Sequence, residues 1–237
     1  MRDHLRWLTA RPIAHRGLHD LARGRPENSL AAFEAALDAR YAIECDLHIS
    51  ADGIPIVFHD DELDRLTNAT GCVRDRTAAE LGALRLAGTR ERIPTLDELL
   101  RMADGHVPLV IELKHVFGRD LGFARAVAER LKTYDGPVAL MSFDIGLIGD
   151  MRTAAPSIPR GLIAYGGWTT ALAQLSALLR LKIDFVSYAI DDLPTAAPVF
   201  ARRALGLPLI CWTVRNPEQR RKADAWTDQI TFEGFTP

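Results

Sequence analysis

Apolar extended segments alternate with helical segments along most of the chain, and this alternation is the strongest constraint on the fold. Strands are predicted at residues 12–14, 41–49, 109–114, 137–143, 161–165, 184–189, 208–214 and 229–233. Helices are predicted at residues 26–39, 95–102, 121–133, 145–154, 169–181, 196–205 and 217–225. This pattern predicts an α/β protein with a (β/α)8 TIM-type barrel. An open doubly wound sheet is the alternative, but no glycine-rich phosphate loop follows the first strand.

The chain is long enough for one large domain. Its 237 residues are 48% hydrophobic, and no linker rich in proline, glycine or serine divides them. We therefore expect residues 1–237 to form a single barrel domain. Residues 61–92 are polar and rich in turns, with a helix start of the capping-box type at Thr77 and Glu80. They are predicted to be a small region inserted in the barrel.

Charge and cysteine content exclude several classes of function. The formal net charge is -2, so the chain has no overall attraction to nucleic acid or to an anionic membrane. The three cysteines are far apart, which argues against a disulfide framework or a thiolate zinc site and fits a reducing compartment. The N-terminal residues carry charges throughout, and no apolar run is long enough for a bilayer. We expect a cytoplasmic protein without a stable membrane anchor, and the sequence leaves a homo-oligomer open.

Two carboxylates interrupt the apolar strand at residues 41–49. Glu44 and Asp46 are two residues apart, so they point to the same face of the strand while Cys45 points away. Two buried like charges raise each other's pKa unless a cation lies between them. The pair therefore indicates either a metal site or a structural pair held by arginine neighbours.

A hairpin follows the acidic strand. The turn at residues 51–53 is too short for a crossover between parallel strands, so residues 54–58 are predicted to pair antiparallel with the acidic strand. Folding back about this turn brings His59 beside Cys45 and Asp46. The hairpin is thus predicted to carry a histidine to the carboxylates.

Charged side chains collect at the C-terminal ends of the predicted strands. They are His15, Glu44, Asp46, Glu112, Lys114 and Glu233. In a barrel these strand ends meet on the face that carries the active site. Structural ion pairs have no reason to gather at one end of so many strands, so we expect an active site there.

Several short segments resemble the glycerophosphodiester phosphodiesterase family in order and spacing, over roughly residues 12–115. They are His15-Arg16-Gly17, Pro26-Glu27-Asn28-Ser29, Glu44-Cys45-Asp46, Asp52-Gly53, His59-Asp60, Arg65-Leu66-Thr67, Ile93-Pro94-Thr95-Leu96 and Glu112-Leu113-Lys114. Ser142-Phe143 and Trp212-Thr213-Val214 extend the resemblance weakly. The resemblance implies a barrel, a bound divalent metal ion, and hydrolysis of glycerophosphodiesters to sn-glycerol 3-phosphate and an alcohol.

The resemblance also implies roles for individual residues. Glu44, Asp46 and Glu112 correspond to metal ligands, His15 and His59 to an acid/base pair, and Arg16 and Lys114 to phosphate and transition-state ligands. Three carboxylates without a thiolate favour Mg²⁺ or Ca²⁺ over zinc. Two histidines near neutral pKa can serve as base and acid on opposite sides of a phosphodiester. Lys114 could instead hold Glu112 in place, and Glu27 could be an ordinary carboxylate in the first turn of a helix.

Two positions depart from the family pattern. Arg215 stands where family members usually have Asn, and the last strand ends in Glu233 rather than Thr-Asp. Arg215 is predicted either to favour an anionic leaving group or to pair with Glu218 at the start of the next helix. His48 is interpreted as structural or supporting, and His19 is predicted to be exposed without a partner.

Three other functions use much of the same site. Attack by a substrate hydroxyl would release a cyclic phosphate, and a lysophospholipid could replace the water-soluble diester. A barrel without catalysis could bind phosphorylated metabolites as a sensor. The sensor is disfavoured because all the predicted histidines and metal carboxylates are present.

Overall fold

The parallel strands form one closed sheet. The computed structural model describes residues 3–115 and 121–237. Its parallel strands are β1 (Ile13–Ala14), β2 (Ala42–Ile49), β4 (Leu109–Leu113), β5 (Val138–Ser142), β6 (Arg160–Ala164), β7 (Phe185–Ala189), β8 (Leu209–Val214) and β9 (Gln229–Phe232). Each pairs with its neighbour along the chain, and β1 pairs in parallel with both β9 and β2. The predicted (β/α)8 barrel is therefore confirmed.

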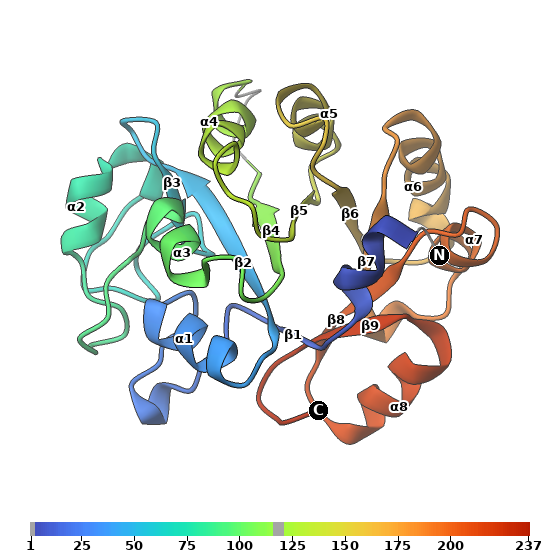
Figure 1. Cartoon of the computed structure of the whole chain (residues 1–237), viewed down its shortest axis with the longest axis horizontal. Helices are drawn as coiled ribbons and strands as arrows, with labels where there is room; N and C mark the ends of the chain where they lie inside the picture. The colour runs from blue at the N-terminus through green and yellow to red at the C-terminus, as the bar shows by residue number, and fades with distance from the viewer. Residues whose placement is uncertain (1–2, 116–120) are drawn as a thin grey trace.

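Helices cover the outside of the barrel (Figure 1). They are α1 (Leu30–Asp38), α3 (Leu96–Ala103), α4 (Leu121–Leu131), α5 (Ile145–Ala154), α6 (Trp168–Arg180), α7 (Ala196–Arg203) and α8 (Pro217–Trp226). Short 3-10 turns, η2 (Leu21–Arg23) and η4 (Ile190–Asp192), lie in two of the loops. The side chains of Ser29, Asp144 and Asn216 accept hydrogen bonds from the first backbone N–H groups of α1, α5 and α8. The caps of α5 and α8 fix helix starts that follow shortly after the ends of β5 and β8.

Two apolar layers hold the barrel together. The larger layer lies between strands and helices and contains Phe33, Phe123 and Tyr188. The smaller one fills the barrel interior and contains Val110 and Phe185. The strands of a barrel are buried on both faces, which explains their nearly continuous apolar sequences. Burial of one large apolar side chain contributes about 1.5–3 kcal/mol to folding.

A short 3-10 helix, η1 (Asp3–Thr9), lies before the first strand. Its Leu5 and Leu8 are 0% and 1% exposed, and Trp7 packs against the apolar cluster inside the barrel. The helix therefore covers the end of the barrel at which β1 begins, away from the strand ends that carry the charged residues. The sequence does not predict this element, because the segment is too short to show a helical period of apolar residues.

The predicted hairpin is present. Strand β3 (Pro55–Val57) pairs antiparallel with β2, with Leu47 opposite Val57. The N–H of Phe58 donates to the carbonyl oxygen of Asp46 at 3.0 Å, so His59 comes next to the acidic strand. The hairpin thus delivers its histidine to the carboxylates as predicted.

Residues 61–92 pack beside the hairpin. They contain η3 (Val73–Asp75) and α2 (Ala78–Ala83), which begins with the predicted capping box of Thr77 and Glu80. They share a separate apolar cluster with the hairpin and with Ile93, which includes Phe58, Leu63 and Leu81. Among the described residues no helix has the length and apolar content needed to cross a bilayer.

Candidate active site

Three buried carboxylates meet between the middle of β2 and the C-terminal end of β4. Glu44 and Asp46 share one face of β2, and the parallel register places Glu112 of β4 opposite Asp46. One oxygen from each carboxylate lies within 4.8 Å of the others, and the residues are 2%, 1% and 7% exposed. Oxygen donors at this spacing fit one hard divalent cation. The structure therefore brings together the three residues predicted as metal ligands.

Burial and mutual repulsion dominate the electrostatics of this trio. Burial and then the charges of Asp46 and Glu112 raise the pKa of Glu44 well above its usual range. Burial and the Asp46 charge raise the pKa of Glu112 to about 7. Burial also opposes ionisation of Asp46, but Lys114 and the other nearby cations hold its pKa below its usual range. A bound cation would displace the protons that two of the carboxylates otherwise retain.

Lys114 lies between two of these carboxylates. Its Nζ is 2.9 Å from Asp46 Oδ1 and 2.9 Å from Glu112 Oε1. The two carboxylates raise the pKa of Lys114, although burial acts in the opposite direction. The ammonium group thus holds Glu112 in place, the alternative role that the sequence left open.

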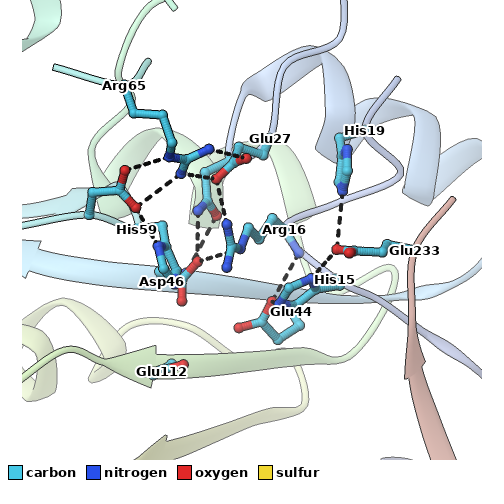
Figure 2. A network of polar contacts seen from close by, with 12 residues as sticks. His15, Arg16, His19, Glu27, Glu44, Asp46, His59, Arg65, Glu112 and Glu233 are labelled. Atoms are coloured by element: carbon cyan, nitrogen blue, oxygen red, sulfur yellow. Dashed lines mark hydrogen bonds and ion pairs between the residues drawn. The ribbon is translucent and has the colours of Figure 1, made fainter. Parts of the chain in front are cut away.

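Two histidines reach the carboxylates from different strands. His15 follows β1, and its backbone N–H donates to the carbonyl oxygen of Phe232 at 3.0 Å. Its Nε2 is 4.0 Å from Glu44 Oε2, and the ring of His59 lies beside Asp46 (Figure 2). Burial lowers the pKa of both histidines. Both rings are therefore neutral near pH 7 and able to accept a proton.

The turn after β1 needs unusual backbone geometry. Arg16 has a φ of 54° and Gly17 a φ of 78°. A Cβ on Gly17 would lie 2.8 Å from the carbonyl carbon of Ala32, too close for any other residue. In this conformation the backbone N–H of Arg16 donates to Glu44 Oε2 at 2.9 Å. Gly17 is thus required for the turn that brings the backbone to the acidic strand.

Glu27 joins two arginines at the rim of the site (Figure 2). Arg16 donates to Glu27 Oε1 at 2.6 Å, and Arg65 donates to both Glu27 oxygens at 2.9 and 2.8 Å. The Arg16 Nε also lies 3.4 Å from Asp46 Oδ2. Glu27 therefore holds Arg16 over the carboxylates and is more than a first-turn carboxylate.

Asn28 is a site residue to which the sequence analysis gave no role of its own. It is 1% exposed, and its side-chain N–H donates to Asp46 Oδ2 at 2.8 Å. The cap of α1 is Ser29. The positive φ of Asn28, 55°, turns its amide from the helix towards the strand. Its place within the family-like segment Pro26–Ser29 was the one available signal.

Apolar side chains form part of the wall of the site. A cavity of about 140 Å³ is lined by the charged residues and, on the other side, by Met141, Ile163 and Trp212. Above this wall Phe143 makes edge contacts with Trp212 and Tyr165, with ring centroids 5.5 and 6.0 Å apart. The aromatic half of the site, formed by Phe143, Tyr165 and Trp212, thus lies beside Met141 and Ile163, while Ser187, Thr213, Arg215 and Thr231 also line the cavity.

Three sequence-based expectations are corrected or refined by these contacts. His19 was predicted to be exposed without a partner, but its Nε2 lies 3.6 Å from Glu233 Oε2. The proposed pairing of Arg215 with Glu218 is wrong, because the Arg215 Nε donates to Glu233 at 2.7 Å. His48 supports the hairpin, because its Nε2 is 3.1 Å from the carbonyl oxygen of His59.

Fold and site together define a class of enzyme. A cation held by carboxylates and a cluster of arginine and lysine can bind a phosphodiester, and two neutral histidines on its flanks can exchange protons with it. The barrel is therefore that of a phosphoric diester hydrolase.

Comparison with known proteins narrows this class. The chain belongs to the glycerophosphoryl diester phosphodiesterase family, whose model matches residues 15–235. It is 32% identical over 235 residues to a glycerophosphodiester phosphodiesterase of Caldanaerobacter subterraneus subsp. tengcongensis, covering 92% of this chain and 91% of that one.

Solved structures agree with this assignment. An Oleispira antarctica phosphodiesterase in complex with its product sn-glycerol-3-phosphate is similar with a TM-score of 0.83 and 27% identity, covering 94% of this chain and 92% of that one. A glycerophosphodiester phosphodiesterase from Thermotoga maritima has the same fold, with a TM-score of 0.75 at 23% identity over 93% of this chain and 92% of that one.

Proposed function

We propose that this protein is a metal-dependent glycerophosphodiester phosphodiesterase that releases sn-glycerol 3-phosphate and an alcohol. The observation that carries the proposal is the trio Glu44, Asp46 and Glu112, whose oxygens lie within 4.8 Å of one another beside two histidines. The product bound by the Oleispira antarctica relative supports the choice of substrate.

The metal ion would be held by the three carboxylates. Oxygen donors favour Mg²⁺ or Ca²⁺, and the bound ion would supply positive charge that polarises a phosphoryl oxygen. Arg16 and Lys114 are the proposed phosphate ligands, because both place a positive charge against Asp46 beside the proposed metal ligands.

His15 and His59 are the proposed proton-transfer groups. One ring takes a proton from the attacking water as the new P–O bond forms, and the other gives a proton to the departing alkoxide as the old P–O bond breaks. Both rings line the same cavity and are neutral at rest, so one must acquire a proton before each turnover. This requirement predicts a bell-shaped dependence of kcat/KM on pH.

The alcohol is proposed to leave towards the aromatic half of the site. Phe143 is 40% exposed and Tyr165 is 59% exposed, so a large apolar surface faces solvent beside the cavity. This surface favours lysophospholipids as a second class of substrate. Comparison of kcat/KM for glycerophosphocholine and lysophosphatidylcholine, in wild type and F143A, tests this second substrate class. A selective loss of the lysophospholipid activity is expected, and an equal loss for both substrates would reject it.

A dialysis experiment tests the main proposal. Protein dialysed against EDTA should lose activity towards a panel of glycerophosphodiesters and regain it with Mg²⁺ or Ca²⁺. Phosphorus NMR in ¹⁸O water should show label in the monophosphate without a cyclic species. Full activity in EDTA would refute the metal requirement, and a cyclic product would favour attack by a substrate hydroxyl.

A further inference from the structure

The two histidines of the site are supported in the same way from opposite sides. His59 Nδ1 is 2.6 Å from Asp60 Oδ1, and Asp60 Oδ2 accepts from Arg65 Nε at 2.5 Å. In each case a carboxylate lies within hydrogen-bond distance of the ring Nδ1, and an arginine donates to that carboxylate. Arg65 lies within the family-like part of the sequence, so this first support was open to prediction.

The second support comes from the two positions that depart from the family pattern. His15 Nδ1 is 2.5 Å from Glu233 Oε2, and Glu233 Oε1 accepts from Arg215 Nε at 2.7 Å. Each oxygen of Glu233 therefore has one short partner. Because the carboxylate can accept but not donate, the His15 proton is placed on Nδ1 and the Nε2 lone pair faces the cavity.

Backbone pairing explains why these residues meet. His15, Glu233 and Arg215 each follow one of the neighbouring strands β1, β9 and β8. The N–H of Glu233 donates to the carbonyl oxygen of Val214 at 3.1 Å, which sets Arg215 beside it. The backbone N–H of Arg215 in turn donates to Gln219 Oε1 of α8 at 2.8 Å. The arginine is thus anchored to both the barrel and the helix layer.

We propose that Arg215, acting through Glu233, is a positioning residue that fixes the orientation and tautomer of His15. This inference rests on the proposed function. A partner at Nδ1 that fixes the tautomer of a histidine is commonly required for its work as a base. Glu233 has a longer side chain than the Asp that is usual in the family. Together with Arg215 it spans the distance from β8 to the ring of His15 at β1. The alternative in which Arg215 contacts an anionic leaving group stays a prediction, because Arg215 also lines the cavity.

Kinetics of single and double variants test the inference. R215Q should lower kcat about 10-fold and E233Q about 100-fold, with KM changed less than about twofold, because the substrate contacts remain. R215K keeps the charge and one donor and should recover part of the loss. The R215Q/E233Q protein should be no worse than E233Q alone, because Arg215 acts only through Glu233.

Arg220 provides a matched control. Its Nε donates to Asp224 at 2.8 Å on the outside of α8, nearly the same contact without a histidine behind it. R220Q should keep wild-type kcat and KM. Losses that multiply in the double variant would overturn the inference, as would a raised KM with unchanged kcat in R215Q, which would assign Arg215 to substrate binding.

Nitrogen NMR of the metal-free protein tests the same inference without activity. The ¹⁵N shifts of His15 should show the Nδ1–H tautomer in wild type and R220Q, and a mixture of tautomers in R215Q. An unchanged tautomer in both R215Q and E233Q would overturn the inference. If wild type has no phosphodiesterase activity, the proposed function fails, while the tautomer measurement still decides the role of Arg215.

Discussion

Replacement of Glu112 by glutamine should stabilise the metal-free protein at alkaline pH. Burial and the Asp46 charge raise the pKa of Glu112 to about 7. A glutamate in the unfolded chain has a pKa of about 4.3, and the difference corresponds to about 4 kcal/mol. The glutamine side chain is nearly the same size and uncharged, so the E112Q substitution removes this penalty and keeps the packing.

The sign follows from proton binding. The folded protein binds the Glu112 proton more tightly than the unfolded chain does, so the free energy of unfolding of wild type falls as pH rises. The loss begins above about pH 4.3 and levels off above about pH 7. The free energy of unfolding of E112Q lacks this contribution to the dependence on pH. In EDTA, we expect the two proteins to be nearly equal in stability at about pH 4 and E112Q to be more stable by about 4 kcal/mol at about pH 8.

Urea denaturation followed by circular dichroism, at several pH values with and without divalent metal, measures this difference. With metal at about 100 times its dissociation constant, wild type should gain about 2.7 kcal/mol. E112Q should gain less, because it has lost a ligand. A pH dependence in EDTA that is identical for the two proteins would refute the assignment of a raised pKa to Glu112.

Three further predictions concern single elements of the site. D46N should keep its far-ultraviolet spectrum but lose stabilisation by Mg²⁺ or Ca²⁺ in thermal melts; full retention would exclude Asp46 as a ligand. H15A and H59A should each lose about 10²–10⁴ in kcat, and the double variant less than the product. In each single variant one limb of the pH profile should flatten, and two surviving limbs in both would contradict the acid/base assignment. G17A should reduce the free energy of unfolding by about 1–3 kcal/mol through its clash with α1; an unchanged urea midpoint would contradict this expectation.

Much of the fold was predictable because its signals are local. Alternation of strands and helices indicated the barrel, and the short turn at residues 51–53 fixed the hairpin that carries His59. The ends of elements were less well predicted: the helix expected to reach residue 205 ends at Arg203. The interpretation of residues 1–237 as one domain, with residues 61–92 as an insertion, stays a prediction.

The less predictable contacts join residues that are distant in sequence. Asn28 reaches Asp46 because of a positive φ that its sequence context does not specify. His19 and Arg215 meet at Glu233 because β1, β9 and β8 are neighbours in the closed sheet. Sequence spacing identifies which residues lie at strand ends, but side-chain reach between strands decides which of them touch.

The seam between β1 and β9 has a consequence for folding. His15 and Glu233, which meet across it, are separated by 218 positions in the chain. Loop closure over such a distance carries an entropic cost before any contact is gained, so this seam is expected to form late. β1 is short, and its two residues contribute few backbone bonds to hold the seam. Local opening there would separate the histidine from its carboxylate while most of the barrel remained intact, so hydrolysis would fail at a lower temperature or denaturant concentration than the bulk secondary structure.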